Sequence, residues 1–263
     1  MGEVASQRVV VLGAGRVATH LVPALMKAGC HVAQIWSRTI ASARQIAAPL
    51  ALSCTDSLEA IVTDADAYIF CVSDEALPFI AAEVVALVGP APLYLHTAGS
   101  IGVDLWRRCG AQHYGILYPL QTFSKERAVD MGEVSLFVEA SDDVSMSGLE
   151  ALAYRLSPKV FRADSKLRAR LHIAAVFACN FTNAMYAVSH RLLADGGIPF
   201  EVLLPLIDET ASKVHSLTPR DAQTGPAVRG DNAVMRSHTD ALAGDGELCD
   251  IYKLLSNYIG NNR

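Results

Sequence analysis

A glycine-rich turn near the N-terminus constrains the fold of this chain more than any other feature. The apolar run of residues 9–12 leads into Gly13-Ala14-Gly15-Arg16-Val17-Ala18, which has the spacing G-x-G-x-x-A. In a strand-turn-helix unit the first glycine allows the tight turn, the second lets a pyrophosphate approach the backbone, and the small last residue lets helix and strand pack closely. The helix N-terminus then offers free N–H groups to the phosphates. We predict a dinucleotide site with contacts from Gly13, Ala14, Gly15, Arg16 and Val17; a plain glycine-rich turn is the competing interpretation.

The first 163 residues alternate short apolar runs with helical patterns. Strands are predicted at residues 9–12, 31–36, 67–72, 92–97 and 113–117, with the last sheet elements at 134–139 and 159–162. Helices are predicted at residues 17–28, 42–48, 57–62, 75–88, 103–109 and 148–156. The interior Pro23 predicts a kink in the first helix. This order is typical of an α/β fold with a Rossmann-type, doubly wound parallel sheet.

The second part of the chain contains no convincing strand. Helices are predicted at residues 166–195, 200–216, 231–243 and 247–259, separated by Gly- and Pro-containing segments. We place a boundary near Asp164, between a nucleotide-binding domain (residues 1–163) and an all-helical domain for dimerisation and substrate binding (residues 164–263).

The end of the second predicted strand indicates which dinucleotide binds. NAD enzymes usually place a carboxylate there for the ribose 2′-OH, whereas NADP needs a cation and hydroxyls for its 2′-phosphate. The chain has Ser37, Arg38 and Thr39 at this point. An arginine can fork onto a phosphate, so the sequence favours NADP over NAD. Alternatively, Ser37 or Thr39 caps the next helix and Arg38 is a solvated charge.

Further candidates follow the strands at the carboxyl edge of the sheet, where ligands of such folds bind. The cofactor candidates are Val72, Ser73, Thr97 and Gly99, although Ser73 can equally cap a helix that begins at residue 75. His96 is a candidate proton donor, or else a structural histidine. The candidate substrate contacts in these loops are Ser100, Gln121 and Ser124, with helix or loop capping as the alternative.

The helical part contains the remaining candidates. An advance of about 100° per residue puts His172, Asn180 and Asn183 on one face of an apolar helix, where they serve either a substrate or structural pairing. A loop rich in turn formers adds Gln223, Thr224 and Arg229 as substrate contacts, or else it is a helix entry capped by Asp231. Because His215 and His238 lack ligand-like spacing, no metal site is predicted.

Composition restricts the partners and the location. The 263 residues carry a net charge of −5, and no Lys/Arg cluster suggests nucleic acid or anionic lipid. Six scattered cysteines and the lack of a signal-peptide pattern at the N-terminus predict a cytoplasmic protein. Only 19% of residues are charged, below the roughly 25% typical of soluble domains. Residues 171–190 hold no formal charge, but their amides and histidines argue against a membrane span. We therefore predict that this helix is buried at the centre of a homodimer.

The motifs GAGRVA, WSRT, HTAGS, YPLQTFS, HIAAVFACNFTNAMY and AQTGPAVRGD resemble a family described as a Rossmann-like domain followed by a domain of unknown function. That family is similar in architecture to the 6-phosphogluconate dehydrogenase and pyrroline-5-carboxylate reductase group. The resemblance implies an NADP-linked oxidoreductase whose helical domain forms the dimer and completes the active site; deazaflavin-dependent NADP reduction is a minor option. The lysine that β-hydroxyacid dehydrogenases place three or four residues before an asparagine is missing here. His172 is the best substitute for it.

Three functional hypotheses follow. The first is hydride transfer between NADPH and a small carbonyl or imine substrate in a cleft between the domains, with His96 or His172 as proton donor and Asn180, Asn183 and Gln121 orienting the substrate. The second is a non-catalytic NADP-binding sensor or scaffold, which the missing lysine keeps open. The third is a protein that only binds a partner through its helical part. The sequence does not name the substrate.

Overall fold

A computed structural model describes residues 7–262 of the chain. The chain divides into two compact units, Met1–Asn183 and Ala184–Arg263, and the division falls inside a long helix. The functional domain boundary near Asp164 stays a prediction; in the structure Asp164 is the N-cap of that helix, and its carboxylate accepts from the Leu167 N–H at 2.7 Å.

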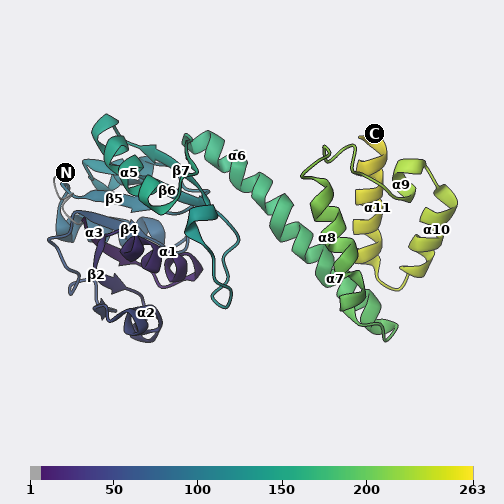
Figure 1. Cartoon of the computed structure of the whole chain (residues 1–263), viewed down its shortest axis with the longest axis horizontal. Coiled ribbons are helices and arrows are strands. Elements are labelled where there is room, and N and C mark those ends of the chain that lie inside the picture. Colours follow the sequence, from purple (N-terminus) through teal and green to yellow (C-terminus); the bar gives the residue numbers. More distant parts are fainter. Residues whose placement is uncertain (1–6, 263) are drawn as a thin grey trace. The chain divides into compact units, whose positions relative to one another are not determined.

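The first unit is built on one eight-stranded sheet with the strand order β3-β2-β1-β4-β5-β6-β7-β8 (Figure 1). All neighbouring strands are parallel except β6 and β7. The chain moves outward from β1 to β3 and then returns to place β4 on the other side of β1, which creates the crevice where doubly wound sheets bind ligands. The strands are β1 (Arg8–Leu12), β2 (His31–Trp36), β3 (Cys54–Thr55), β4 (Ala67–Phe70), β5 (Leu93–His96), β6 (His113–Leu120), β7 (Ser135–Ala140) and β8 (Val160–Arg162). The sequence thus predicted the α/β class correctly, but it missed the two-residue β3 and did not predict that β7 runs antiparallel to β6.

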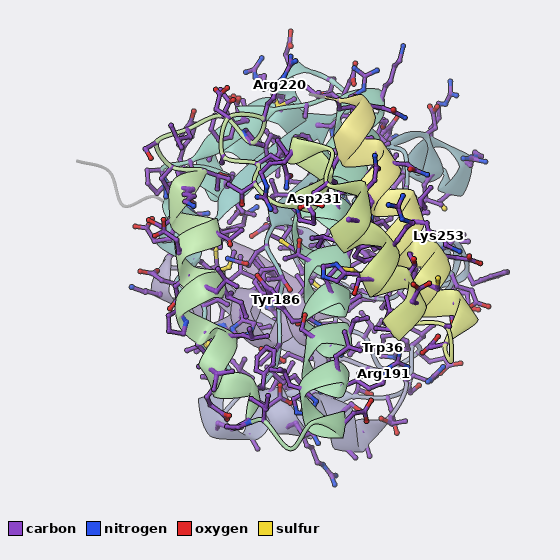
Figure 2. The ribbon with its side chains drawn as sticks, turned by 90° about the vertical axis from the view of Figure 1, so that its right-hand side faces the viewer. Trp36, Tyr186, Arg191, Arg220, Asp231 and Lys253 are labelled. Carbon is purple, nitrogen blue, oxygen red and sulfur yellow. The ribbon has the colours of Figure 1, made fainter. Side chains whose placement is uncertain are left out.

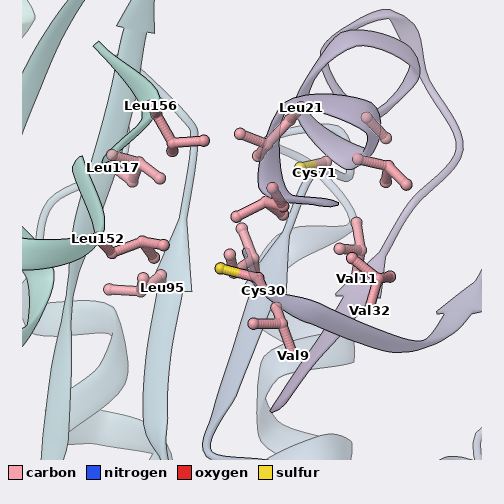
Figure 3. Packing of buried hydrophobic residues seen from close by; sticks show 14 of the residues in the cluster. Val9, Val11, Leu21, Cys30, Val32, Cys71, Leu95, Leu117, Leu152 and Leu156 are labelled. Atoms are coloured by element: carbon pink, nitrogen blue, oxygen red, sulfur yellow. The ribbon is translucent and has the colours of Figure 1, made fainter. Parts of the chain in front are cut away.

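Helices cover both faces of this sheet. One face packs against α1, α2 and α5, and the other against α3 and α4. Side chains alternate along β1, so that Val9 and Val11 join the first cluster while Val10 and Leu12 join the second. Figure 3 shows part of the first cluster. The helices are α1 (Arg16–Lys27), α2 (Ile40–Ala47), α3 (Leu77–Val88), α4 (Asp104–Cys109) and α5 (Asp143–Leu156), with short 3₁₀ turns η1 (Ala48–Leu50) and η2 (Met131–Glu133).

Helix α1 contains Pro23, as expected, and the kink there stays a prediction. One local prediction was wrong. No helix forms at residues 57–62, because buried side chains from the sheet take the backbone groups of this segment. The Gln34 amide donates to the Ala60 carbonyl at 3.0 Å and accepts from the Val62 N–H at 2.9 Å, and the Tyr68 hydroxyl donates to the Val62 carbonyl. Residue periodicity carries no signal of such long-range partners.

One helical run of 31 residues, Ser165–Asp195, leaves the sheet. It consists of α6 (Ser165–Ala175), a π-helical segment η3 (Val176–Phe181) and α7 (Thr182–Asp195). By length and hydropathy alone this run suffices to cross a bilayer, and its apolar window has no buried residues in the chain. Its first two turns, however, are tied to the sheet unit by the buried Arg168.

The second unit is entirely helical in the described residues. It contains the rest of α7, then η4 (Phe200–Leu203), α8 (Leu204–Lys213), α9 (Pro226–Arg229), α10 (Asn232–Ala241) and α11 (Gly246–Asn261). Figure 2 labels Tyr186 and Arg191 on α7, Asp231 before α10 and Lys253 on α11. The ion pair of Arg191 with Asp245, at 2.7 Å, joins α7 to the start of α11.

Candidate active site

The glycine turn has the backbone that the motif predicts. Gly13 adopts φ +110°, and a side chain there would place its Cβ 2.4 Å from the Cys71 carbonyl oxygen. Only glycine fits, because both the angle and the contact exclude a Cβ. Gly15 is the N-cap of α1, no acidic residue lies in the first turn, and Arg16 begins the helix. The free N–H groups and the dipole of α1 therefore suit an anion.

A pocket of about 440 Å³ opens beside this turn. Its walls come from the glycine turn, the end of β2, the loop after β4 and the first turns of α3. The predicted cofactor residues that line it are Gly13, Ala14, Gly15, Ser37, Arg38, Thr39, Val72 and Ser73. Arg16 and Val17 lie in the adjoining first turn of α1, and Thr97 and Gly99 follow β5.

The residues after β2 are arranged as a phosphate site requires. Arg38 and Thr39 are exposed, and Arg38 has no ion pair among the described residues. Thr39 occupies the N-cap of α2, yet its hydroxyl donates to Ser42 Oγ at 2.8 Å rather than accepting from the helix backbone. The capping alternative therefore fails for the Thr39 side chain. Sequence reasoning missed the other lining residues, among them Glu83 of α3 and Trp36, whose Nε1 is buried without a partner among residues 7–262.

The loops after β4 and β5 exclude one capping alternative and add an acidic residue to this edge of the sheet. Helix α3 begins at Leu77, and Ser73 contributes its backbone carbonyl to the turn, so the Ser73 side chain is not the cap. Thr97 is buried, and its hydroxyl donates to the Phe70 carbonyl at 3.3 Å. The Ser100 hydroxyl donates to the Asp74 carboxylate, which brings an acid to this edge of the sheet that sequence reasoning left without a role.

His96 does not fit the role of proton donor. It ends β5, it is fully buried, and its Nδ1 accepts from the Ala98 N–H at 3.2 Å. Burial, together with the positive charge of Arg168, lowers the pKa of His96 to about 3. The imidazole is therefore neutral at physiological pH and has no exposed surface on which to meet a substrate, which supports the structural alternative.

His172 instead pairs with Tyr118, a residue that sequence analysis did not select. The Tyr118 hydroxyl at the end of β6 and Nδ1 of His172 on α6 are 3.1 Å apart. The two rings meet edge to face beside Gly99, where a Cβ would lie 2.8 Å from His172 Nδ1. Burial raises the pKa of Tyr118, Arg168 opposes this effect, and Asp74 adds to it, so the phenol is protonated at neutral pH. The first letter of the YPLQTFS motif was the available signal for Tyr118.

The π-helical segment η3 alters the helical face that Asn180 and Asn183 were predicted to share with His172. Asn180 lies in the π-helical segment, where hydrogen bonds run from i to i+5, and the Thr182 hydroxyl donates to the Phe177 carbonyl five residues earlier. The regular advance of about 100° per residue therefore does not hold between His172 and Asn183. Asn180 and Asn183 are both exposed. Single π turns are frequent at functional sites, which keeps both residues as candidates.

The remaining substrate candidates lie in the loop after β6 and in the second unit. Gln121 is exposed and its Oε1 accepts from the Thr122 N–H, while the Ser124 carbonyl lies 2.7 Å from Nε2 of His20 on α1. Gln223, Thr224 and Arg229 belong to the second unit. There the Gln223 amide donates to the Thr224 carbonyl, and Gln223 lines a pocket of about 430 Å³ with Tyr258. Asp231 caps α10, as one alternative predicted. In residues 7–262 no cluster of three or more His, Cys, Asp or Glu suits a metal ion.

The fold and the glycine turn define a Rossmann-type α/β protein in which a helical region follows the sheet along the chain. The family described as a domain of unknown function (DUF2520) matches residues 134–259, and the family described as shikimate/quinate 5-dehydrogenase matches residues 1–91. A crystal structure from Bacteroides fragilis, described as a "putative NADP oxidoreductase", has 44% sequence identity and a TM-score of 0.92 over 97% of this chain and 98% of that chain. The chain belongs to the family of that Bacteroides protein.

More distant structures share the fold alone. An imine reductase from Myxococcus stipitatus in complex with NADP⁺ has 16% identity and a TM-score of 0.64 over 97% of this chain and 92% of that chain. A 1-pyrroline-5-carboxylate reductase from Streptococcus pyogenes has 14% identity and a TM-score of 0.65 over 97% and 99%. No curated protein matches the chain.

Proposed function

We propose that this protein is an NADP-dependent oxidoreductase that transfers hydride between NADPH and a small carbonyl or imine substrate. The observation that carries the proposal is the hydrogen bond between Tyr118 and His172 at the carboxyl edge of the sheet, in the same unit as the pocket with the features of a dinucleotide site. The oxidoreductase description of the Bacteroides relative supports it. That the substrate binds between the two domains stays a prediction, as do the roles of Asn180 and Asn183.

The pocket beside the glycine turn fits a phosphorylated dinucleotide. The Gly13 turn lets a phosphate approach the backbone beside α1. Arg38, which has no ion pair among residues 7–262, offers a cation for the 2′-phosphate, and Trp36 Nε1, which has no partner among the same residues, is a spare donor in the wall. When bound, NADPH supplies the hydride. The protein's part is to hold the cofactor and to manage the accompanying proton.

The Tyr118 and His172 pair is suited to that proton. A phenol whose pKa is raised by burial keeps its proton at neutral pH, and an imidazole nitrogen at hydrogen-bond distance can take up or return a proton. His172 is the proposed substitute for the lysine that β-hydroxyacid dehydrogenases place before an asparagine, and Tyr118 gives it a partner.

We further propose that the protein is a homodimer. The run α6–η3–α7 exposes large apolar side chains, among them Ile173, Phe177 and Phe181, at 59%, 65% and 50%. Contiguous apolar surface of this kind is typical of interfaces. A second copy covers it in this proposal, in place of a lipid bilayer. The cytoplasmic location stays a prediction from composition.

Purified protein tests the proposed function. We expect NADPH to bind with greater affinity than NADH, measured by calorimetry, and an imine or aldehyde panel to show NADPH turnover by absorbance. Tyr118→Phe and His172→Ala should abolish turnover while the Kd for NADPH stays unchanged. Tight NADPH binding without turnover of any panel member would favour the sensor or scaffold, and absence of NADPH binding would overturn both.

A further inference from the structure

Arg168 is a buried charge for which the proposed chemistry has no direct use. It lies on the second turn of α6 with 1% of its surface exposed. Its guanidinium forms an ion pair with Glu139 of β7, and it donates to the Ile101 carbonyl at 2.6 Å and to Ser165 Oγ at 3.2 Å. Charges are seldom buried so deeply unless they are paired.

The same cluster holds both elements that meet at the Tyr118 and His172 pair. His172 follows Arg168 by four residues, so the two lie one helical turn apart on one face of α6. Ile101 follows Gly99 by two residues in the loop after β5. Ser165 adds a second tie, because its Oγ accepts from the Val103 N–H at 3.1 Å and donates to Glu139 at 2.8 Å. One guanidinium therefore fixes the helix of His172 and the loop of Gly99 to each other.

We propose that Arg168, with Glu139 and Ser165, is a positioning residue that sets the distance between His172 and Tyr118. This inference rests on the proposed function of that pair. The packing leaves little tolerance, since the Gly99 Cα already lies so close that a Cβ would be 2.9 Å from Tyr118 Cε2. The charge also acts on the pair, because Arg168 opposes the rise in the Tyr118 pKa that burial causes.

A purely structural role and a positioning role for Arg168 lead to different expected results. Buried ion pairs can often be replaced by apolar side chains of similar volume without loss of stability. A purely structural Arg168 should therefore tolerate the double replacement Arg168→Met with Glu139→Leu. If the cluster positions His172, the same protein should fold but lose the hydrogen-bond geometry of the pair.

The chain offers a matched control. Arg162 of β8 and Glu150 of α5 form a second Arg–Glu pair in the same unit, with two hydrogen bonds of 2.6 and 2.7 Å, on the surface. The double variant Arg162→Met with Glu150→Leu removes the same groups away from the pair. Both double variants are compared with wild type in the full-length protein.

The decisive measurement is the ¹⁵N chemical shift of His172 Nδ1, which reports the hydrogen bond without requiring turnover. We expect the Arg168/Glu139 variant to shift this signal toward its value in Tyr118→Phe, and the control to leave it unchanged. With 1-pyrroline or an aldehyde as probe, kcat should fall by a factor of about 100, with the Kd for NADPH within about twofold of wild type, because misplacement by about 1 Å has such effects.

An unchanged His172 signal in the folded Arg168/Glu139 variant would overturn the inference. If that variant does not fold, Arg168→Lys keeps the charge but not the contacts to Ile101 and Ser165; a shifted His172 signal then supports positioning and an unshifted one overturns it. If wild type shows no turnover, or Tyr118→Phe retains it, the proposed function fails while the chemical shift still tests the positioning role.

Discussion

The Tyr118 hydroxyl lies 3.1 Å from Nδ1 of His172, which joins the end of β6 to α6 across 54 residues of sequence. Both residues belong to the first compact unit. The pair therefore exists within the sheet unit itself, at the edge where the strands around the glycine turn end. Gly99 packs against both rings and makes their approach possible.

Gly99→Ala should disable this pair. The added Cβ would lie 2.8 Å from His172 Nδ1 and 2.9 Å from Tyr118 Cε2, so one of the rings must move. We expect kcat to fall by a factor of about 10 to 100, and overpacking to cost about 1–3 kcal/mol in the free energy of unfolding. Steady-state kinetics and urea denaturation measure both.

Gly102→Ala is the control in the same loop, because its Cβ would meet Ser165 Oγ at an ordinary 3.6 Å. That variant should stay close to wild type in both measurements. Wild-type kcat in Gly99→Ala would show that the tight contact has no functional importance.

Arg38→Ala should reduce the preference for NADPH over NADH. A charged hydrogen bond to the 2′-phosphate contributes about 1.5–3 kcal/mol, so the Kd for NADPH should rise by a factor of about 10 to 100 while the Kd for NADH stays constant. Calorimetry with both cofactors measures this change. Arg44→Ala, an exposed arginine on α2, serves as the control and should alter neither affinity. Equal losses for the two cofactors would refute a phosphate-specific role for Arg38.

Local signals were sufficient to predict most of the sheet. The run Val9 to Leu12 and the glycines after it specify a buried strand and a tight turn from neighbouring residues alone, and β2 was predicted with its observed bounds. The segment at residues 57–62 was mispredicted as a helix, since its backbone partners come from Gln34 and Tyr68, which lie elsewhere in the sequence.

The candidate site was less predictable for the same reason. The groove residues after β1 and β2 follow motifs, whereas the Tyr118 and His172 pair depends on packing between a strand and a distant helix. His96 resembled a proton donor in sequence because nothing there indicates its complete burial. The wider π-helical turn of η3 likewise could not be predicted from a regular helical period.

His96 should make the protein less stable in mild acid. Burial and Arg168 lower its pKa to about 3 in the folded state, against an unfolded value near 6.5. Between these values the unfolded state binds the extra proton, so stability is fully present above about pH 6.5 and is lost as the pH falls toward 3. From about pH 7 to about pH 5 this single group should remove about 2 kcal/mol from the free energy of unfolding.

The measurement compares urea denaturation of wild type and His96→Asn at both pH values. In wild type the Ala98 N–H donates to His96 Nδ1. The asparagine side chain offers an acceptor for the same N–H but does not titrate. His96→Asn should therefore lose about 2 kcal/mol less than wild type on acidification, and the exposed His31→Asn should behave as wild type. An identical pH dependence in wild type and His96→Asn would contradict the prediction.

Phe177→Glu should convert the proposed dimer into monomers. Phe177 is 65% exposed and meets Phe181 edge to face at 5.0 Å, so the two rings form one apolar patch on η3. A charge placed there would be buried without a partner in a dimer, which is strongly unfavourable. Light scattering at micromolar concentration should give twice the 28.1 kDa chain mass for wild type and a single chain mass for the variant. Phe79→Glu, at a phenylalanine of α3 that is 71% exposed, is the matched control and should stay dimeric. A monomeric wild type, or one that sediments with phospholipid vesicles, would mean that something other than a second copy covers this helix.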